Sequence, residues 1–156
     1  MATIHKYNTF LKTQMNGGDD TTGSSAANAA RVIDFDNNTL KIMLCTSSYA
    51  PNVATQACVN SVTNEVSGAG YTAGGITLTG CTLTLVGGTV TFDANDVTWF
   101  ESVGGFTDAR YAVIYKDTGT ANTSTLFAYI DLISNKGNSD ADLVIQMNAL
   151  GIATWV

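Results

Sequence analysis

The spacing of apolar and polar residues along this chain changes near residue 32. From Ile4 to Met15 the large apolar residues recur every three or four positions, which places them on one face of a short helix. Asn16-Gly17-Gly18 then ends that helix. Residues 17–30 offer only small or polar side chains, so we expect a flexible arm or loop there. A short Ala-rich helix over residues 25–31 is the alternative.

Beyond residue 32 the spacing becomes two, which is typical of half-buried strands. Asp36-Asn37-Asn38 indicates a hairpin turn, Gly80 indicates a bend or bulge within one strand, and a short helix fits within residues 53–66. The predicted strands cover residues 32–35, 40–45, 76–85, 89–92, 97–100, 111–115, 126–133, 143–147 and 152–156.

Many short strands at regular spacing, without alternating helices, predict a mainly β fold. We expect an antiparallel β-sandwich or jelly roll of about eight strands with a short N-terminal helix. The chain then divides into an N-terminal helix and flexible arm, residues 1–31, and a β-sandwich domain, residues 32–156.

Composition narrows the classes of function. Hydrophobic residues make up 45% of the chain and charged residues only 13%, so the surface must consist largely of Thr, Ser, Asn and Gly. Seven Lys and Arg residues, spread thinly against thirteen Asp and Glu, give a net charge of −6 and argue against a nucleic-acid partner. Without an apolar leader or an uninterrupted apolar stretch of membrane-spanning length, we expect synthesis in the cytoplasm and no membrane partner.

The cysteines point to a reducing compartment. Cys45, Cys58 and Cys81 are odd in number and widely spaced, which fits neither a small disulfide framework nor the paired cysteines of a zinc site. We expect all three to be reduced, buried thiols.

The side chains that could support catalysis are few. His5 is the single histidine, and its position ahead of the β core argues against a Ser–His–acid or Cys–His arrangement. We therefore expect an exposed terminal histidine. The many glycines fall in predicted turns, and none opens a helix after a strand as a phosphate-binding loop requires. We expect neither enzymatic activity nor a cofactor.

Acidic residues gather in one stretch, from Asp93 through Glu101 to Asp108. Asp and Asn in such positions usually cap and turn the backbone, and this is the interpretation we favour. Two carboxylates there would also suit a glycosidase pair, and Asp93, Asn95 and Asp96 are candidate Ca²⁺ ligands, although the full calcium-loop pattern is absent.

Aromatic residues in or beside predicted loops are either core plugs or interface anchors. Arg110 precedes a predicted strand, where it would either pair with Asp108 or Asp117 or form a subunit contact. The candidate interface residues are Tyr49, Tyr71, Phe100, Phe106 and Arg110.

Four segments together resemble small virion structural proteins of tailed bacteriophages, which are head-associated, decoration or minor tail components. They are residues 40–52 (LKIMLCTSSYAPN), 64–75 (NEVSGAGYTAGG), 92–99 (FDANDVTW) and 109–121 (ARYAVIYKDTGTA). The resemblance covers about the last four-fifths of the chain and keeps its order. It implies a non-enzymatic component of the virion and brings no catalytic residue with it.

We therefore expect a capsid decoration or cement protein that binds the lattice of the major capsid protein, or other virion proteins, as a homo-oligomer. A low share of charged residues and a Thr/Asn-rich surface suit dense packing of protein subunits. Repetition of the contact on a symmetric lattice supplies avidity. The alternatives are a tail or fibre component that binds the host surface and, more remotely, a carboxylate-based glycan hydrolase using Asp93, Asp96 and Glu101.

Overall fold

The computed structural model describes residues 3–15, 30–148 and 151–155 and confirms a mainly β protein. All named strand pairs in these ranges are antiparallel. One sheet has the order β1-β8-β7-β2-β3, a second the order β10-β5-β4, and β6 pairs with β9. The strands are β1 (Thr3–Lys6), β2 (Leu40–Thr46), β3 (Ile76–Thr77), β4 (Thr82–Val86), β5 (Thr89–Asp93), β6 (Val97–Trp99), β7 (Ala109–Lys116), β8 (Leu126–Lys136), β9 (Leu143–Ile145) and β10 (Ala153–Trp155).

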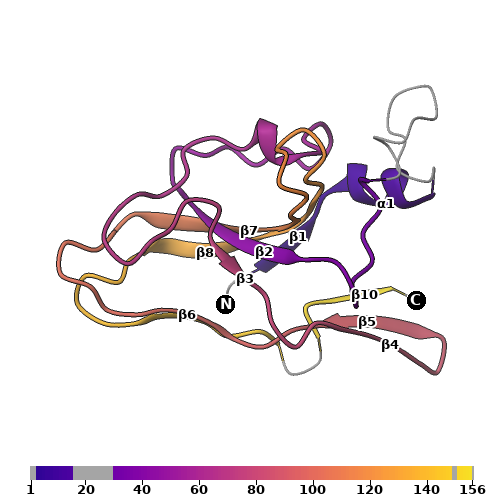
Figure 1. The fold of residues 1–156 in the computed structure, drawn as a ribbon. Helices are drawn as coiled ribbons and strands as arrows, with labels where there is room; N and C mark the ends of the chain where they lie inside the picture. Colours follow the sequence, from indigo (N-terminus) through magenta and orange to yellow (C-terminus); the bar gives the residue numbers. More distant parts are fainter. Residues whose placement is uncertain (1–2, 16–29, 149–150, 156) are drawn as a thin grey trace.

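The strands form two layers, as expected for a sandwich. In Figure 1, β1, β2, β7 and β8 form one layer, and β4, β5, β6 and β10 lie below it. Aromatic rings fill the space between the layers: Phe92 of β5 lies 4.6 Å from Phe35 and 5.6 Å from Phe127 of β8, measured between ring centroids. Such edge and tilted contacts add to the free energy gained by burying the rings. The two layers therefore share one core.

Strand β2 is buried on both faces, although its alternation predicted a single buried face. Leu40, Ile42 and Leu44 face one way, but Met43 and Cys45 on the other face are also buried. The connection from β2 to β3, which contains the 3-10 helix η1 (Val59–Ser61), covers this second face (Figure 1). A long loop with its own apolar residues therefore adds a cover to the sandwich.

The N-terminal segment differs from the predicted helix over residues 4–15. Thr3–Lys6 forms β1, which pairs with β8, and the helix α1 covers only Asn8–Met15. The edge of β8 offers backbone partners that an isolated sequence pattern does not reveal. Tyr7 and Phe10 are buried in the main core. The described part of residues 1–31 is thus packed into the sandwich, and the predicted arm at 17–30 lies almost wholly outside the described residues.

The predicted hairpin over residues 32–45 is wrong, because residues 32–35 do not form a strand. The Asp34 carboxylate accepts hydrogen bonds from the backbone N–H groups of Asp36 and Asn37, and the Asn38 side chain accepts one from the Asp34 N–H. These local bonds compete with strand pairing. They produce a tight turn that inserts Ile33 and Phe35 into the core.

The alternating stretch over residues 76–85 is divided between the two layers. Its first part, β3, pairs with β2, whereas its second part, β4, pairs with β5. Gly80 lies between them at φ +63°, a conformation that glycine adopts without strain, and the Asn95 side chain covers it so closely that a Cβ would clash. The predicted bend at Gly80 is therefore the point where the chain changes sheet. All five residues of β4 are exposed, not half-buried as predicted.

Candidate interaction surfaces

The candidate interface residues separate by burial. Tyr49 and Phe106 are core residues, whereas Phe100 is 73% exposed. Tyr71 is partly buried, and its hydroxyl donates to Glu65 Oε1 at 2.7 Å. Of the four candidate aromatics, Phe100 is therefore the most exposed.

Arg110 has a different partner from either predicted acid. Its guanidinium contacts the Asp131 carboxylate at 2.7 Å and lies over the Tyr111 ring at 5.4 Å. Asp131 belongs to β8, next to β7, so the pair joins neighbouring strands of one sheet. Pairing with Asp108 or Asp117 was therefore wrong: the charge holds two strands in register instead.

The buried tyrosines support the fold through hydrogen bonds. The Tyr7 and Tyr49 hydroxyls lie 2.8 Å apart, and Tyr49 donates to Gln56 Oε1 at 2.8 Å. Burial raises the pKa of Tyr49 to about 12, and burial together with the Tyr49 bond raises the pKa of Tyr7 further. Both hydroxyls stay protonated at neutral pH. The network links the N-terminal segment to the β2–β3 connection.

The acidic stretch forms one local contact, at Asp93, and long-range contacts at Asn95 and Asp96, so the favoured turn interpretation fits Asp93 alone. Asp93 accepts a bond from the Ala94 N–H, and Asp96 accepts one from the Met147 N–H at 2.8 Å. The Asn95 side chain donates to the Thr79 hydroxyl at 3.1 Å. Among the described residues no group of three or more His, Cys, Asp or Glu side chains is placed to hold a metal ion. The side chains of the three Ca²⁺ candidates thus bond to three different parts of the chain, at Ala94, Thr79 and Met147.

His5 belongs to β1 rather than to a helix, and it is exposed as predicted. Its ring stacks on Tyr129 of β8 at 4.8 Å between centroids. Cys45 and Cys58 are buried thiols outside any disulfide, whereas Cys81 is a partly buried one. The cysteines are thus thiols as expected, with less burial at Cys81.

The first exposed apolar surface is the tip of the β4–β5 hairpin. Leu85 is 70% exposed and Val86 is 76% exposed, and residues 82–92 contain no charged side chain. Leu83 pairs with the buried Phe92, and Leu85 pairs with Val90 two residues further out on the same face. The apolar face of this hairpin therefore continues outward past the core, toward the tip seen at the lower right of Figure 1.

One N–H group on the free backbone edge of this hairpin is already hydrogen-bonded to an acidic side chain. Asp36 Oδ1 accepts a hydrogen bond of 2.9 Å from the Leu83 N–H. An acidic side chain on an edge strand discourages pairing with a strand from another chain. The hairpin thus presents apolar side chains while its backbone edge is partly blocked.

The second exposed apolar surface is the 100–105 loop, which follows β6. Val103 is 96% exposed at the tip, close in sequence to the exposed Phe100. The Gly105 N–H donates to the Ser102 carbonyl at 2.9 Å, and Gly104 has φ +75° at the third position of this turn. This is the arrangement of a type II turn, which favours glycine there. The turn fixes Val103 outward.

Asn138 holds the backbone of this loop in place. The residue is fully buried, and its amide nitrogen donates to the Phe100 carbonyl at 2.9 Å and to the Ala69 carbonyl at 3.3 Å. Its amide oxygen accepts a bond of 3.0 Å from the Phe106 N–H. A buried amide with its hydrogen bonds made is a rigid junction. The sequence alone identified the loop aromatics as candidates. It did not identify Asn138, because in the sequence this residue looks like any other asparagine in a turn.

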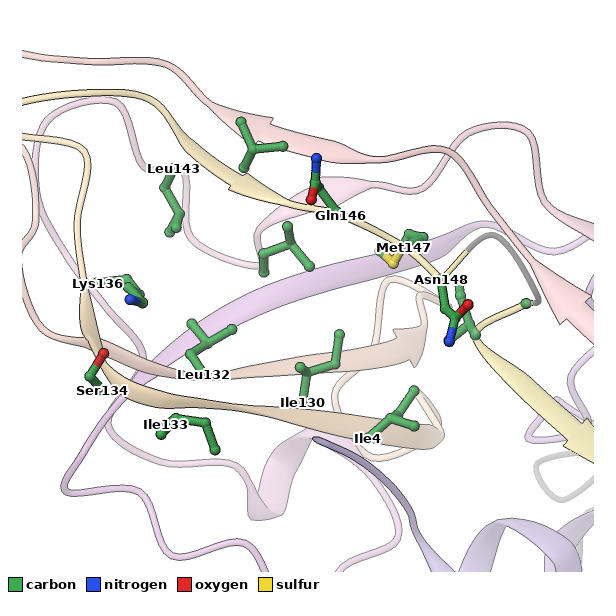
Figure 2. Close-up of a pocket in the computed structure, with 14 residues that line it drawn as sticks. Ile4, Ile130, Leu132, Ile133, Ser134, Lys136, Leu143, Gln146, Met147 and Asn148 are labelled. Atoms are coloured by element: carbon green, nitrogen blue, oxygen red, sulfur yellow. The ribbon is translucent and has the colours of Figure 1, made fainter. Parts of the chain in front are cut away.

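A groove opens along one side of the sandwich, between β8 and β9. Its volume is about 810 Å³. Figure 2 shows Lys136 and Leu143 toward one end and Ile4, Met147 and Asn148 toward the other. Its apolar lining includes Ile4, Ile130, Leu132, Leu143, Ile145 and Met147.

The groove exists because the two layers do not close on this side. Within the described residues, β9 pairs only with β6, and β1 pairs with β8 only as far as Asp131. The apolar residues of β8 beyond that point therefore face the gap, and Ile133 is exposed. The sequence predicted both strands, but it did not indicate that their facing sides would stay apart.

The 100–105 loop and the groove lie next to each other. Trp99, just before the loop, pairs with Leu143, which lines the groove. The Glu101 N–H donates to the Asp142 carboxylate at 2.7 Å, immediately before β9. A projecting apolar loop and an apolar groove thus share one end of the molecule.

The comparisons with family models, curated proteins and solved structures give no match for this chain. No helix in the described ranges is long and apolar enough to span a membrane.

Proposed function

We propose that this chain is a non-enzymatic structural protein of a bacteriophage particle, and that it decorates the capsid by binding the lattice of the major capsid protein as a homo-oligomer. The resemblance in residues 40–52, 64–75, 92–99 and 109–121 supports the virion assignment. Decoration is supported by the low share of charged residues and by exposed apolar surfaces on a β scaffold.

The observation that carries the proposal is the uncharged tip of the β4–β5 hairpin. Exposed apolar side chains gathered in one place mark a surface that another molecule covers. Leu85 and Val86 project from a short two-stranded segment whose turn is Gly87-Gly88. A capsid lattice repeats the same acceptor many times, so each hairpin needs only modest affinity for an oligomer to bind firmly.

Binding to purified empty shells tests the proposal. We expect the wild-type protein to cosediment with shells and to appear on the capsid surface by electron microscopy. Replacing Leu85 and Val86 together by Ser removes the burial of two apolar side chains, each worth about 1.5–3 kcal/mol when fully covered, and lowers the affinity of each copy at least about 100-fold. Leu11→Ser, at an exposed apolar residue of α1, is the control that leaves binding unchanged.

Three results count against the proposal. Wild-type protein that never binds shells contradicts decoration, and so does a particle map that places the chain only in the tail. Equal binding by the hairpin variant and the wild type contradicts the hairpin as the contact.

A further inference from the structure

The 100–105 loop has the properties of a preformed binding element. Its backbone is tied by Asn138 and by the Asp142 carboxylate, so little conformational entropy is lost when it is covered. It displays Phe100 and Val103 with the exposed Glu101 between them. The surface that accepts this loop must therefore be apolar, recessed and positively charged at its margin.

The β8–β9 groove has these features. Its lining is mainly aliphatic, and it is recessed between the two layers. Lys136 lies at the end of the groove near Leu143 and is exposed (Figure 2). Within the described part of the chain, neither the Lys136 nor the Glu101 side chain has a hydrogen-bonding or ionic partner. Both charges are available to a second molecule.

We propose that the 100–105 loop of one copy docks in the β8–β9 groove of a second copy. Phe100 and Val103 pack against the aliphatic lining, and Glu101 pairs with Lys136 of the second copy. The charge complementarity of loop and groove favours a second copy over an unrelated partner. The loop cannot fill its own groove, because its backbone bonds to Asn138 and the β9 end hold its side chains outward.

The closeness of loop and groove suits a two-fold arrangement. When the same patch on both molecules contains a projection and a matching recess, each molecule inserts its loop into the other. Every dimer then contains two loop–groove contacts. Doubling the contact in this way brings the buried area toward the roughly 800 Å² per partner of a stable interface.

Exchanging the two charges tests the proposal in the purified protein. Glu101→Lys and Lys136→Glu each place like charges in both contacts, so each single variant is expected to dissociate at least about tenfold more readily in sedimentation velocity. The double variant restores opposite charges and recovers wild-type assembly. Both sites are exposed, so thermal unfolding of all three variants should match the wild type.

Apolar and hairpin variants complete the design. Val103→Ser is expected to be monomeric at concentrations where the wild type is dimeric, whereas the Leu85 and Val86 double Ser variant assembles normally. A wild type that stays monomeric at all concentrations, or a double charge variant no better than the singles, overturns the loop–groove contact.

The inference rests on the proposed function in that it names the contact between copies of a decorating protein. The two can nevertheless fail separately. A monomer that still binds shells through its hairpin rejects the loop–groove contact alone. A dimer with the expected charge dependence that never binds shells rejects decoration alone.

Discussion

At the scale of single residues, one buried amide holds two loops at one end of the sandwich. Asn138 contacts the backbone at Ala69, Phe100 and Phe106, so the loss of its side chain leaves buried backbone groups without partners. Each such group costs about 1–3 kcal/mol. We therefore expect Asn138 to contribute strongly to the stability of the fold, although it is a polar residue.

Asn138→Ala should lower the free energy of unfolding by at least about 3 kcal/mol in urea titrations. Asn60→Ala removes an exposed asparagine and should change this free energy by less than about 0.5 kcal/mol. Equal stability of the two variants would show that the junction is dispensable.

Buried cysteine and tyrosine side chains without a charged partner of opposite sign make the stability of the fold sensitive to alkaline pH. Burial raises the pKa of Cys45 from 9.0 to about 12 and that of Tyr49 from 10.0 to about 12. A raised pKa in the folded state means that folding favours the neutral form. Its contribution is complete below the pKa of the unfolded chain and is lost as pH rises through the folded value.

We therefore expect the free energy of unfolding to be steady up to about pH 9 and to fall between pH 9 and 12, by about 1.4 kcal/mol per unit of pKa difference. Urea unfolding at a series of pH values measures this. High salt screens the repulsion of the net negative charge but not the cost of burial, so the loss should persist there. Stability that is unchanged to pH 12 would contradict the burial of these groups.

At the scale of elements, the β4 edge is both exposed and restrained. Its restraint is the bond between Asp36 and the Leu83 N–H, and its apolar side chains remain available to a partner. An edge strand of this composition without a charge beside it is a site of strand addition and aggregation.

Asp36→Ala should increase aggregation of concentrated protein, measured by light scattering over time, and lower stability by about 1 kcal/mol. Asp108→Ala removes the same charge from another exposed position and is the control for net charge. If both variants aggregate alike, charge rather than edge protection is responsible.

The sequence predicted the elements whose pattern depends on their own residues. Strands β7 and β8 were found because nearly continuous apolar stretches lie between clear turns. It missed β1, because pairing with β8 decides that strand, and it joined β3 to β4, because the change of sheet at Gly80 leaves the alternation intact. The same limit applies to the groove, whose walls are predicted strands at an unpredicted separation.

The candidate surfaces illustrate this limit in the side chains. Four loop aromatics looked equivalent in the sequence, yet Tyr49 and Phe106 are buried and Phe100 is exposed. Burial of a loop aromatic depends on which distant segment covers it. The exposed hairpin tip was missed for the same reason, since its alternation is that of a covered strand.

At the scale of the whole molecule, the N-terminal residues and the sandwich form a common core. The Phe10 ring of α1 lies 5.0 Å from Phe127 of β8 and 5.8 Å from Phe35, measured between centroids. The predicted division at residue 31 therefore does not separate two cores. We therefore expect the N-terminal residues and the sandwich to unfold together in a single transition.

Phe10→Ala should lower the free energy of unfolding by about 3–5 kcal/mol, as expected for a buried phenylalanine. Leu11→Ala changes the next residue of the same helix, which is half-exposed, and should cost less than about 1 kcal/mol. For both variants, tryptophan fluorescence and circular dichroism should follow one common transition, because Trp99 and Trp155 report on the second layer while the dichroism reports on all strands. Two separate transitions, or a small effect of Phe10→Ala, would mean that the N-terminal segment only rests on a sandwich that folds without it. In that case its removal would leave the hairpin and the 100–105 loop intact, and the groove would lose only the part of its lining that Ile4 supplies.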